Sequence, residues 1–233
     1  MKVDIWSDIR CPFCYIGKRK FEIALEQFPH KDNIEVVWHS FELDLNLKTD
    51  PSANSLERLA QRKGMTIQQA QQMVQHVSDA AKEADLHFDT SKTVTANSFN
   101  AHRLIQLAKT KGLGKEAKEQ LLKAFFIDSK NIDDDQTLTE IGSLIGLDPD
   151  EVEKLLSSNA YEEAVRQDEM QAQNLGINGV PFFIFNNKYA VSGAQSPATF
   201  LQALEQSWGE SEEADELDII VEGKTCPTNG DCN

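Results

Sequence analysis

Residues 7–21 read SDIRCPFCYIGKRKF, and this stretch joins an apolar strand to an amphipathic helix. Val3, Ile5 and their neighbours form a short apolar strand before it. Apolar residues then recur at helical spacing as far as Phe28, which indicates a helix with one buried face. The next apolar segment, NIEVVWHSFEL, is β-branched and aromatic and predicts a second strand. Together the three segments predict a βαβ unit whose strands pair in parallel through a right-handed crossover.

The chain changes character between residues 51 and 176, where helix signals dominate. Thr66 and Gln69 have the spacing of a capping box, in which each side chain bonds the other's backbone N–H. Asp148 and Pro149 supply an N-cap and a first-turn proline for a later helix. We expect six or seven helices in this stretch and no strand.

Strand patterns return in GVPFFIFNNKYAVSG, residues 179–193. Its two apolar runs flank Asn186 and Asn187, whose side chains tolerate the left-handed conformation of a tight hairpin turn. Ser196 and Pro197 then mark the start of a terminal helix. The order of elements is βαβ, helices, ββα. It predicts an α/β chain with a thioredoxin-like fold interrupted by a large all-α insertion.

This order divides the chain into three parts. We expect a discontinuous thioredoxin-like domain over residues 1–50 and 177–208. A helical insertion domain would cover residues 51–176. Residues 209–233 begin with the acidic run GESEEADELD and would form a solvated linker followed by a Cys-containing tail.

Composition narrows the classes of partner and the compartment. The 233-residue chain has a formal net charge of −15, which argues against nucleic acid, since phosphate binding uses clustered Lys and Arg. No apolar run approaches the roughly 20 residues that cross a bilayer, and the N-terminal residues lack a secretory signal pattern. We therefore expect a cytoplasmic protein without a membrane partner, in which a CxxC is catalytic or metal-binding rather than a structural disulfide.

Cys11 and Cys14 form this CxxC motif where the first helix begins. Pro12 suits the first helical turn, and the unpaired N–H groups there favour an anion, so we expect a depressed pKa for Cys11. Cys11 would then attack disulfides, and Cys14, one turn later, would resolve the mixed disulfide. Two other interpretations are a Cys₄ zinc site and a chance pair of small buried residues. The dithiol fits the spacing best, and no metal is assigned.

Pro181 in GVPFF allows two interpretations. A trans proline could simply start an edge strand. A cis Val180–Pro181 bond would instead place backbone N–H and C=O groups beside Cys11, where a substrate strand could pair with them. The local sequence alone does not decide between the two, because cis bonds are a minority of about 5–6% of X-Pro bonds.

The segments SDIRCPFCYIGK, GVPFFIF and AVSGAQSP resemble the DsbA-like thioredoxin-fold oxidoreductases. Within that family the chain is most similar to FrnE-type proteins, relatives of 2-hydroxychromene-2-carboxylate isomerase and of kappa-class glutathione transferases. The resemblance runs from Lys2 to Ser207. It implies Cys11 as the attacking thiol, Cys14 as the resolving thiol, and Val180 with cis-Pro181 as contacts of the bound substrate.

The resemblance implies a thiol–disulfide oxidoreductase acting on protein or small-molecule disulfides. Its partners would be protein thiols and disulfides and glutathione, and it would need no cofactor. The alternative activity is that of a glutathione-dependent isomerase or transferase. Members of that branch usually carry a lone Ser or Cys in the place of Cys11, so Cys14 favours dithiol exchange. A third possibility is a peptide-binding module, which would have no use for a reactive CxxC.

Three further features stay open at this stage. Cys226 and Cys232 bracket PTNGD, whose Pro, Asn and Gly favour a tight turn that would bring the two sulfurs together. They are either a structural staple, idle thiols, zinc ligands or a second redox pair that exchanges electrons with the first. Asp8 is either a proton acceptor for the dithiol or a cap of the following turn. We interpret His39, on the second strand, as structural.

Overall fold

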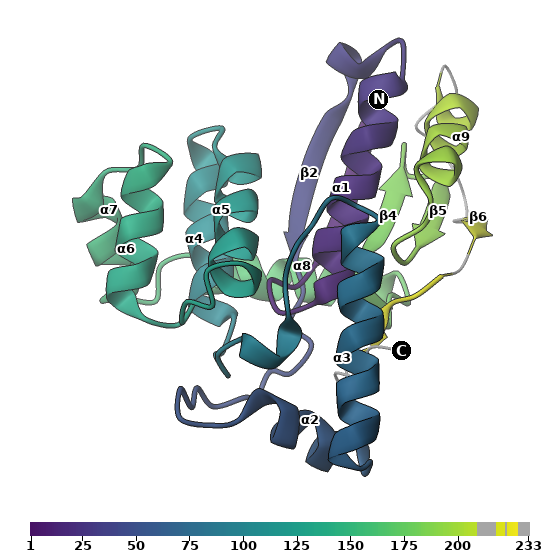
Figure 1. Ribbon diagram of the computed structural model, residues 1–233. Coiled ribbons are helices and arrows are strands. Elements are labelled where there is room, and N and C mark those ends of the chain that lie inside the picture. The colour runs from purple at the N-terminus through teal and green to yellow at the C-terminus, as the bar shows by residue number, and fades with distance from the viewer. Residues whose placement is uncertain (209–217, 222, 228–233) are drawn as a thin grey trace. The chain divides into compact units, whose positions relative to one another are not determined.

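The computed structural model describes residues 1–208, 218–221 and 223–227. The chain divides into two compact units (Figure 1). One comprises Met1–Leu43 together with Asp168–Asn233, and the other comprises Asp44–Gln167. The division into thioredoxin-like domain, insertion domain and tail stays a prediction, because compactness within one chain does not test independent folding.

A mixed sheet forms the centre of the first unit, with the strand order β2-β1-β4-β5-β6. β1 pairs in parallel with β2 and antiparallel with β4. β4 pairs antiparallel with β5, and β5 pairs in parallel with β6. The strands are β1 (Lys2–Ser7), β2 (Glu35–Ser40), β4 (Phe182–Phe185), β5 (Tyr189–Ser192) and β6 (Asp218–Val221). The predicted βαβ and ββα parts, and with them the α/β thioredoxin-like fold, are confirmed.

Two helices, α1 (Pro12–Gln27) and α9 (Pro197–Ser207), pack against each other beside this sheet. Aromatic rings from both helices also contact the sheet. The ring centroid of Phe183 on β4 lies 5.6 Å from that of Phe21 and 4.6 Å from that of Phe200. Phe21 and Phe200 are 5.7 Å apart. All three side chains are buried, and each contributes about 1.5–3 kcal/mol of burial free energy. This cluster fixes α1, and therefore the CxxC, on the sheet.

The β4–β5 hairpin and the start of α9 follow the predicted local chemistry. Asn186 and Asn187 have φ values of 53° and 55°, the left-handed pair that a two-residue turn requires. The Ser196 side chain accepts a hydrogen bond from the Thr199 N–H, and Pro197 occupies the first turn. Both predictions are confirmed.

The tail contributes two strands that the sequence pattern did not predict. β6 extends the main sheet beyond β5, pairing Tyr189 with Asp218 and Ala190 with Ile219. β7 (Cys226–Pro227) pairs antiparallel with β3 (Gly179–Val180) in a separate two-stranded sheet. The short segment DIIV follows an acidic run, and the sequence pattern there indicated a linker rather than a strand. It forms a strand by pairing with the edge of β5.

The second unit is helical. Within residues 51–176, all of them described, the α-helices are α2 (Ser55–Lys63), α3 (Ile67–Lys82), α4 (Phe99–Thr110), α5 (Gly114–Phe126), α6 (Asp135–Leu144), α7 (Pro149–Leu156) and α8 (Glu162–Asn174), the last continuing into the first unit. Two short 3₁₀ helices, at Lys31–Asn33 and Thr90–Lys92, complete the helical elements described. Thr66 and Gln69 form the predicted capping box, and Asp148 caps α7. The expected number of helices is confirmed.

Candidate active site

Cys11 and Cys14 lie at the start of α1, just after the loop that follows β1. Cys11 is the N-cap residue, with extended backbone angles, and Pro12 follows in the first turn. The Cys14 N–H donates to the Cys11 carbonyl across 3.0 Å, which closes the first turn. Both cysteines are free and buried. The placement of Cys11 at the helix N-terminus agrees with the sequence analysis.

Val180 and Pro181 lie beside this helix end. The Val180–Pro181 peptide bond is cis, and the Cys11 Sγ lies 3.5 Å from the Val180 carbonyl oxygen. A Cβ on Gly17 would meet the Pro181 Cγ at 2.9 Å, so α1 reaches Pro181 only because residue 17 has no side chain. The Pro181 carbonyl in turn accepts a hydrogen bond from the Gly193 N–H at 2.9 Å. The structure therefore brings Cys11, Val180 and Pro181 together.

The expected depression of the Cys11 pKa is wrong for this arrangement. Burial raises the pKa of the Cys11 thiol well above its ordinary value, and its hydrogen bond with Cys14 and the negative charge of Asp8 raise it further. Cys11 is 0% exposed. The helix N-terminus favours a thiolate by only about 0.3–1 kcal/mol, which does not offset the loss of solvation. Sequence reasoning missed this because burial is a property of the folded chain.

Asp8 occupies the turn between β1 and α1. Its carboxylate accepts hydrogen bonds from the Arg10 N–H at 3.1 Å and from the Leu43 N–H at 2.8 Å. The side chain is fully buried. The bond from Arg10 is that of the turn cap that the sequence allowed, and the bond from Leu43 ties the loop that carries Cys11 to the segment after β2. Asp8 also places a negative charge near the dithiol, which disfavours its thiolate form.

A buried network of polar side chains joins β1, β2 and α8. His39 Nδ1 lies 2.8 Å from Asp168 Oδ1, and His39 Nε2 lies 2.6 Å from Asp4 Oδ1. The His39 ring stacks on Trp6 at 4.3 Å, and the Trp6 indole N–H donates to the Asp168 carbonyl at 3.0 Å. Burial lowers the His39 pKa, but the hydrogen bonds with Asp168 and Asp4 outweigh it, so the pKa is raised. These contacts are structural in kind.

The tail brings a third cysteine to the site. Cys226 is fully buried and disulfide-bonded. The Cys11 thiol donates a hydrogen bond to the Cys226 Sγ across 3.0 Å. In the β3–β7 pairing, Cys226 is in register with Val180. A sulfur held in a disulfide is not a thiolate, so Cys226 is not a zinc ligand in this state. Cys232 lies outside the described residues.

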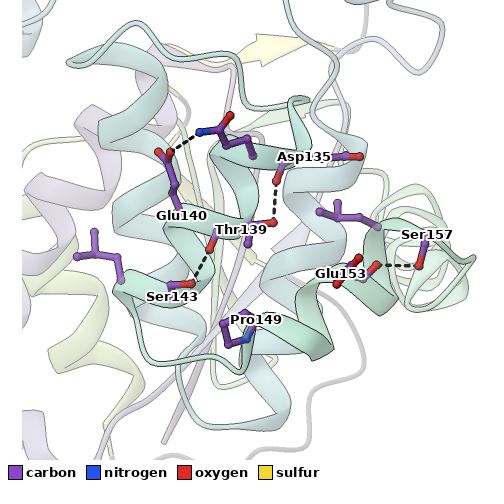
Figure 2. Close-up of a pocket in the computed structure, with 10 residues that line it drawn as sticks. Asp135, Thr139, Glu140, Ser143, Pro149, Glu153 and Ser157 are labelled. Atoms are coloured by element: carbon purple, nitrogen blue, oxygen red, sulfur yellow. Dashed lines mark hydrogen bonds between the residues drawn. The ribbon is translucent and has the colours of Figure 1, made fainter.

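A hollow of about 940 Å³ lies elsewhere, between α6 and α7 of the helical unit (Figure 2). The hydroxyl groups along it bond back to their own helices: Thr139 to the Asp135 carbonyl at 2.8 Å and Ser143 to the Thr139 carbonyl at 2.9 Å. No cysteine lines it. Because these hydroxyls are already satisfied, the hollow offers little to orient a ligand, and it is not the candidate site.

Among the residues that the structure describes, no group of three or more His, Cys, Asp or Glu side chains could hold a metal ion. Across those same residues, every helix is too short or too polar to cross a membrane.

The chain matches known proteins over most of its length. A family model described as DSBA-like thioredoxin domain matches residues 2–205. The uncharacterized protein YwbO of Bacillus subtilis (strain 168) is 28% identical over 214 residues, which are 87% of this chain and 94% of that protein.

Solved structures are also similar to this chain over most of its length. A probable DsbA oxidoreductase from Streptomyces coelicolor is 39% identical with a TM-score of 0.86, and the match covers 100% of this chain and 98% of that one. Cytosolic disulfide reductase DsbM from Pseudomonas aeruginosa, solved with GSH, is 17% identical with a TM-score of 0.63, covering 88% and 98%. A 2-hydroxychromene-2-carboxylate isomerase is 16% identical with a TM-score of 0.62, covering 90% and 95%. The last two show a shared fold alone.

Proposed function

Because the chain belongs to the DsbA-like thioredoxin domain family, we propose that it is a thiol–disulfide oxidoreductase working through Cys11 and Cys14. The observation that carries the proposal is the position of the free Cys11 thiol. Cys11 is the N-cap residue of α1, and its thiol contacts the Val180 carbonyl beside the cis peptide bond. A nucleophilic sulfur and a strand able to bind a peptide thus meet at one point.

The reaction proceeds by two sulfur displacements. The Cys11 sulfur attacks one sulfur of a substrate disulfide, and the other sulfur leaves and takes up the proton that the Cys11 thiol gives up. Cys14, one helical turn away, then attacks the Cys11 sulfur of the mixed disulfide and releases the reduced substrate. Two electrons pass to the substrate, and Cys11 and Cys14 become a disulfide. The same steps in reverse oxidise a substrate dithiol.

Substrate binds along β3. Val180 offers its backbone to an antiparallel strand, the pairing that β7 makes in this structure. Backbone hydrogen bonds of this kind give affinity without strong dependence on side chains. We therefore propose that Val180 and Pro181 contact an extended segment of the substrate that carries its reacting cysteine.

The proposed partners are protein thiols and disulfides and, as a small-molecule partner, glutathione. The net charge of −15 disfavours nucleic acid. We place the protein in the cytoplasm, with neither a membrane partner nor a cofactor. The similarity in fold to a cytosolic disulfide reductase solved with GSH supports this assignment.

A glutathione-dependent isomerase or transferase is the alternative. The fold is compatible with it, since 2-hydroxychromene-2-carboxylate isomerase shares that fold. The second free thiol, Cys14, argues for exchange instead, because members of that branch usually carry a lone Ser or Cys in the place of Cys11.

The test is the reduction of insulin and of glutathione disulfide by the full chain. Wild type, Cys11→Ser and Cys14→Ser are compared, with Ser143→Ala in the helical unit as a control. We expect Cys11→Ser to abolish turnover and Cys14→Ser to accumulate mixed disulfides, while Ser143→Ala keeps the wild-type rate. Equal rates for Cys11→Ser and wild type would refute the proposal.

A further inference from the structure

Residues 223–227 lie across the edge of β3 that the proposed function assigns to substrate. β7 pairs antiparallel with β3, which sets Cys226 in register with Val180. Both of these residues are fully buried. We propose that residues 223–227, here called the strap, close the site: while the strap is paired with β3, neither a substrate strand nor an external disulfide reaches Val180 and Cys11. The inference rests on the function proposed above, because it concerns access to the same nucleophile.

The strap is held by backbone contacts that do not involve a sulfur. The Lys224 carbonyl accepts a hydrogen bond from the Ala194 N–H at 3.2 Å. A Cβ on Gly193 would meet the Lys224 carbonyl oxygen and the Gly223 carbonyl carbon, each at 2.6 Å, so the two backbones pack directly on each other. Because these contacts are between backbones, the seat of the strap does not depend on the oxidation state of Cys226.

Two glycines leave the space that the strap needs. A Cβ on Gly179 of β3 would meet the Thr225 Oγ1 at 2.8 Å. On the strap itself, a Cβ on Gly223 would overlap the side-chain amide of Gln195 and lie 3.2 Å from the Ser192 carbonyl oxygen. A side chain at either glycine would therefore weaken the seat of the strap, from β3 in one case and from the strap in the other.

The closed strap denies access to the nucleophile. Cys11 is 0% exposed, and its thiol donates to the Cys226 Sγ across 3.0 Å. Exchange requires the attacking sulfur to meet the sulfur under attack, so a fully covered thiol does not react with an external disulfide. The edge of β3 pairs with one strand at a time, so a substrate segment that binds Val180 has to replace β7. Exchange with an external substrate therefore begins from a form in which the strap has left β3.

The strap can open while the rest of the unit stays folded. β3 and β7 are two residues long each, and two-stranded pairings on their own are marginally stable. Short segments of this kind open locally at a small fraction of the cost of global unfolding. β6 remains paired with β5 when the strap lifts, which keeps the strap near its seat. The observed rate of reaction at Cys11 is then the rate of the open form multiplied by the fraction of molecules that are open.

Alkylation measures access to Cys11 without turnover. Cys14→Ser supplies a background in which a label on the peptide that contains residue 11 reports Cys11 alone. Reduced full-length protein, with and without Gly223→Val, is treated with iodoacetamide at one pH, and the labelling of Cys11 is followed by mass spectrometry. Gly223→Val should raise the rate by about 5- to 30-fold, the change in population that about 1–2 kcal/mol produces. Gly64→Val, in the helical unit, is the matched control and should keep the parent rate.

Two further measurements address the same strap. Gly179→Ala disturbs the contact from the side of β3, so it should also speed the alkylation of Cys11. Hydrogen exchange of wild type should show protected amides in residues 223–227, and Gly223→Val should lose that protection. In the Cys14-containing protein, Gly223→Val should accelerate the reduction of insulin and of glutathione disulfide by the same factor at substrate concentrations below saturation, because both substrates react with the same open fraction.

The outcomes separate the strap from the proposed function. Parent rates of Cys11 alkylation in both Gly223→Val and Gly179→Ala, or unprotected amides in residues 223–227 of wild type, would overturn the strap. Insulin reduction by wild type would leave the proposed function standing in that case. If wild type reduces neither insulin nor glutathione disulfide, the proposed function fails, and alkylation of Cys11 still decides whether the strap covers it.

Discussion

Replacing His39 by Gln should destabilise the protein strongly, although residue 39 touches no cysteine in any contact described. The His39 ring lies between Asp168 and Asp4, at 2.8 Å and 2.6 Å, and its side chain is 9% exposed. A glutamine amide can donate to one carboxylate only, so the other loses its hydrogen bond with residue 39.

The cost follows from these contacts. A hydrogen bond to a charged group contributes about 1.5–3 kcal/mol, and His39 makes two. Gln keeps one of these bonds, so the loss of the other accounts for about 1.5–3 kcal/mol. Breaking a buried ion pair by removing one partner costs about 3–5 kcal/mol, because the charge opposite the carboxylate is lost together with the hydrogen bond. We therefore expect the free energy of unfolding to fall by about 3–5 kcal/mol. His87→Gln is the control, because that side chain is 75% exposed and its carboxylate contact is 3.8 Å long.

The contact of His39 with Asp4 and Asp168 should also make the stability of the protein depend on pH. The pKa of His39 is raised in the folded state, so its contribution is complete below the unfolded value of about 6.5 and is lost as pH rises through the folded pKa. Burial raises the Asp4 pKa, but hydrogen bonds from His39 and Lys2 lower it overall, so that contribution is lost as pH falls through its folded pKa. His39→Gln should therefore flatten the decline of stability above pH 6.5.

Urea unfolding followed by circular dichroism at pH 6, 7.5 and 9 measures both effects. The slope against urea should be unchanged, so that a shifted midpoint reports stability. The reasoning is refuted if His39→Gln and His87→Gln have the same midpoint at pH 6. The difference in unfolding free energy between wild type and His39→Gln should be smaller at pH 9 than at pH 6. An equal or larger difference at pH 9 also contradicts the reasoning.

Three further predictions concern the site and its scaffold. Asp8→Asn removes a negative charge that raises the Cys11 pKa, so iodoacetamide should alkylate Cys11 at a lower pH than in wild type; an unchanged pH profile would contradict this. Gly17→Val should slow insulin reduction and cost about 1–3 kcal/mol of stability, because its Cβ would meet the Pro181 Cγ at 2.9 Å; Gly64→Val, at a left-handed position with open space, separates backbone strain from this clash. Thr66→Ala should cost about 1 kcal/mol by removing the α3 capping box and leave the exchange rate unchanged, as thermal unfolding and the insulin assay will show.

The sequence predicts features that depend on neighbouring residues. The Asn186–Asn187 turn, the Pro197 helix start and the Cys11 N-cap each follow from chemistry within four or five positions. Their conformations are decided by local sterics and backbone hydrogen bonds, so tertiary contacts had little to change. The parallel pairing of β1 and β2 follows because a helical crossover of this length permits it.

Features that depend on distant residues were not predictable in the same way. Asp168 meets His39 across 129 positions, and nothing in the helix of Asp168 marks it as a partner. Cys226 reaches Cys11 across 215 positions, and the sequence offered an approach of the tail to the CxxC only as one of four interpretations of the tail cysteines. The Cys11 pKa was predicted in the wrong direction for the same reason, since the burial that decides it is created by tertiary packing.

The pairing of β6 with β5 also affects how the chain can be shortened for study. Without β6, the backbone N–H and C=O groups along Tyr189–Ser192 would form an open sheet edge, and such edges recruit strands from other molecules. A chain that ends at Ser207 would lose the tail cysteines and gain a surface prone to aggregation in the same step. Reduced activity in that truncated chain would then mix redox chemistry with self-association. Cysteine-to-serine substitutions keep the edge covered, so they isolate the role of the sulfurs.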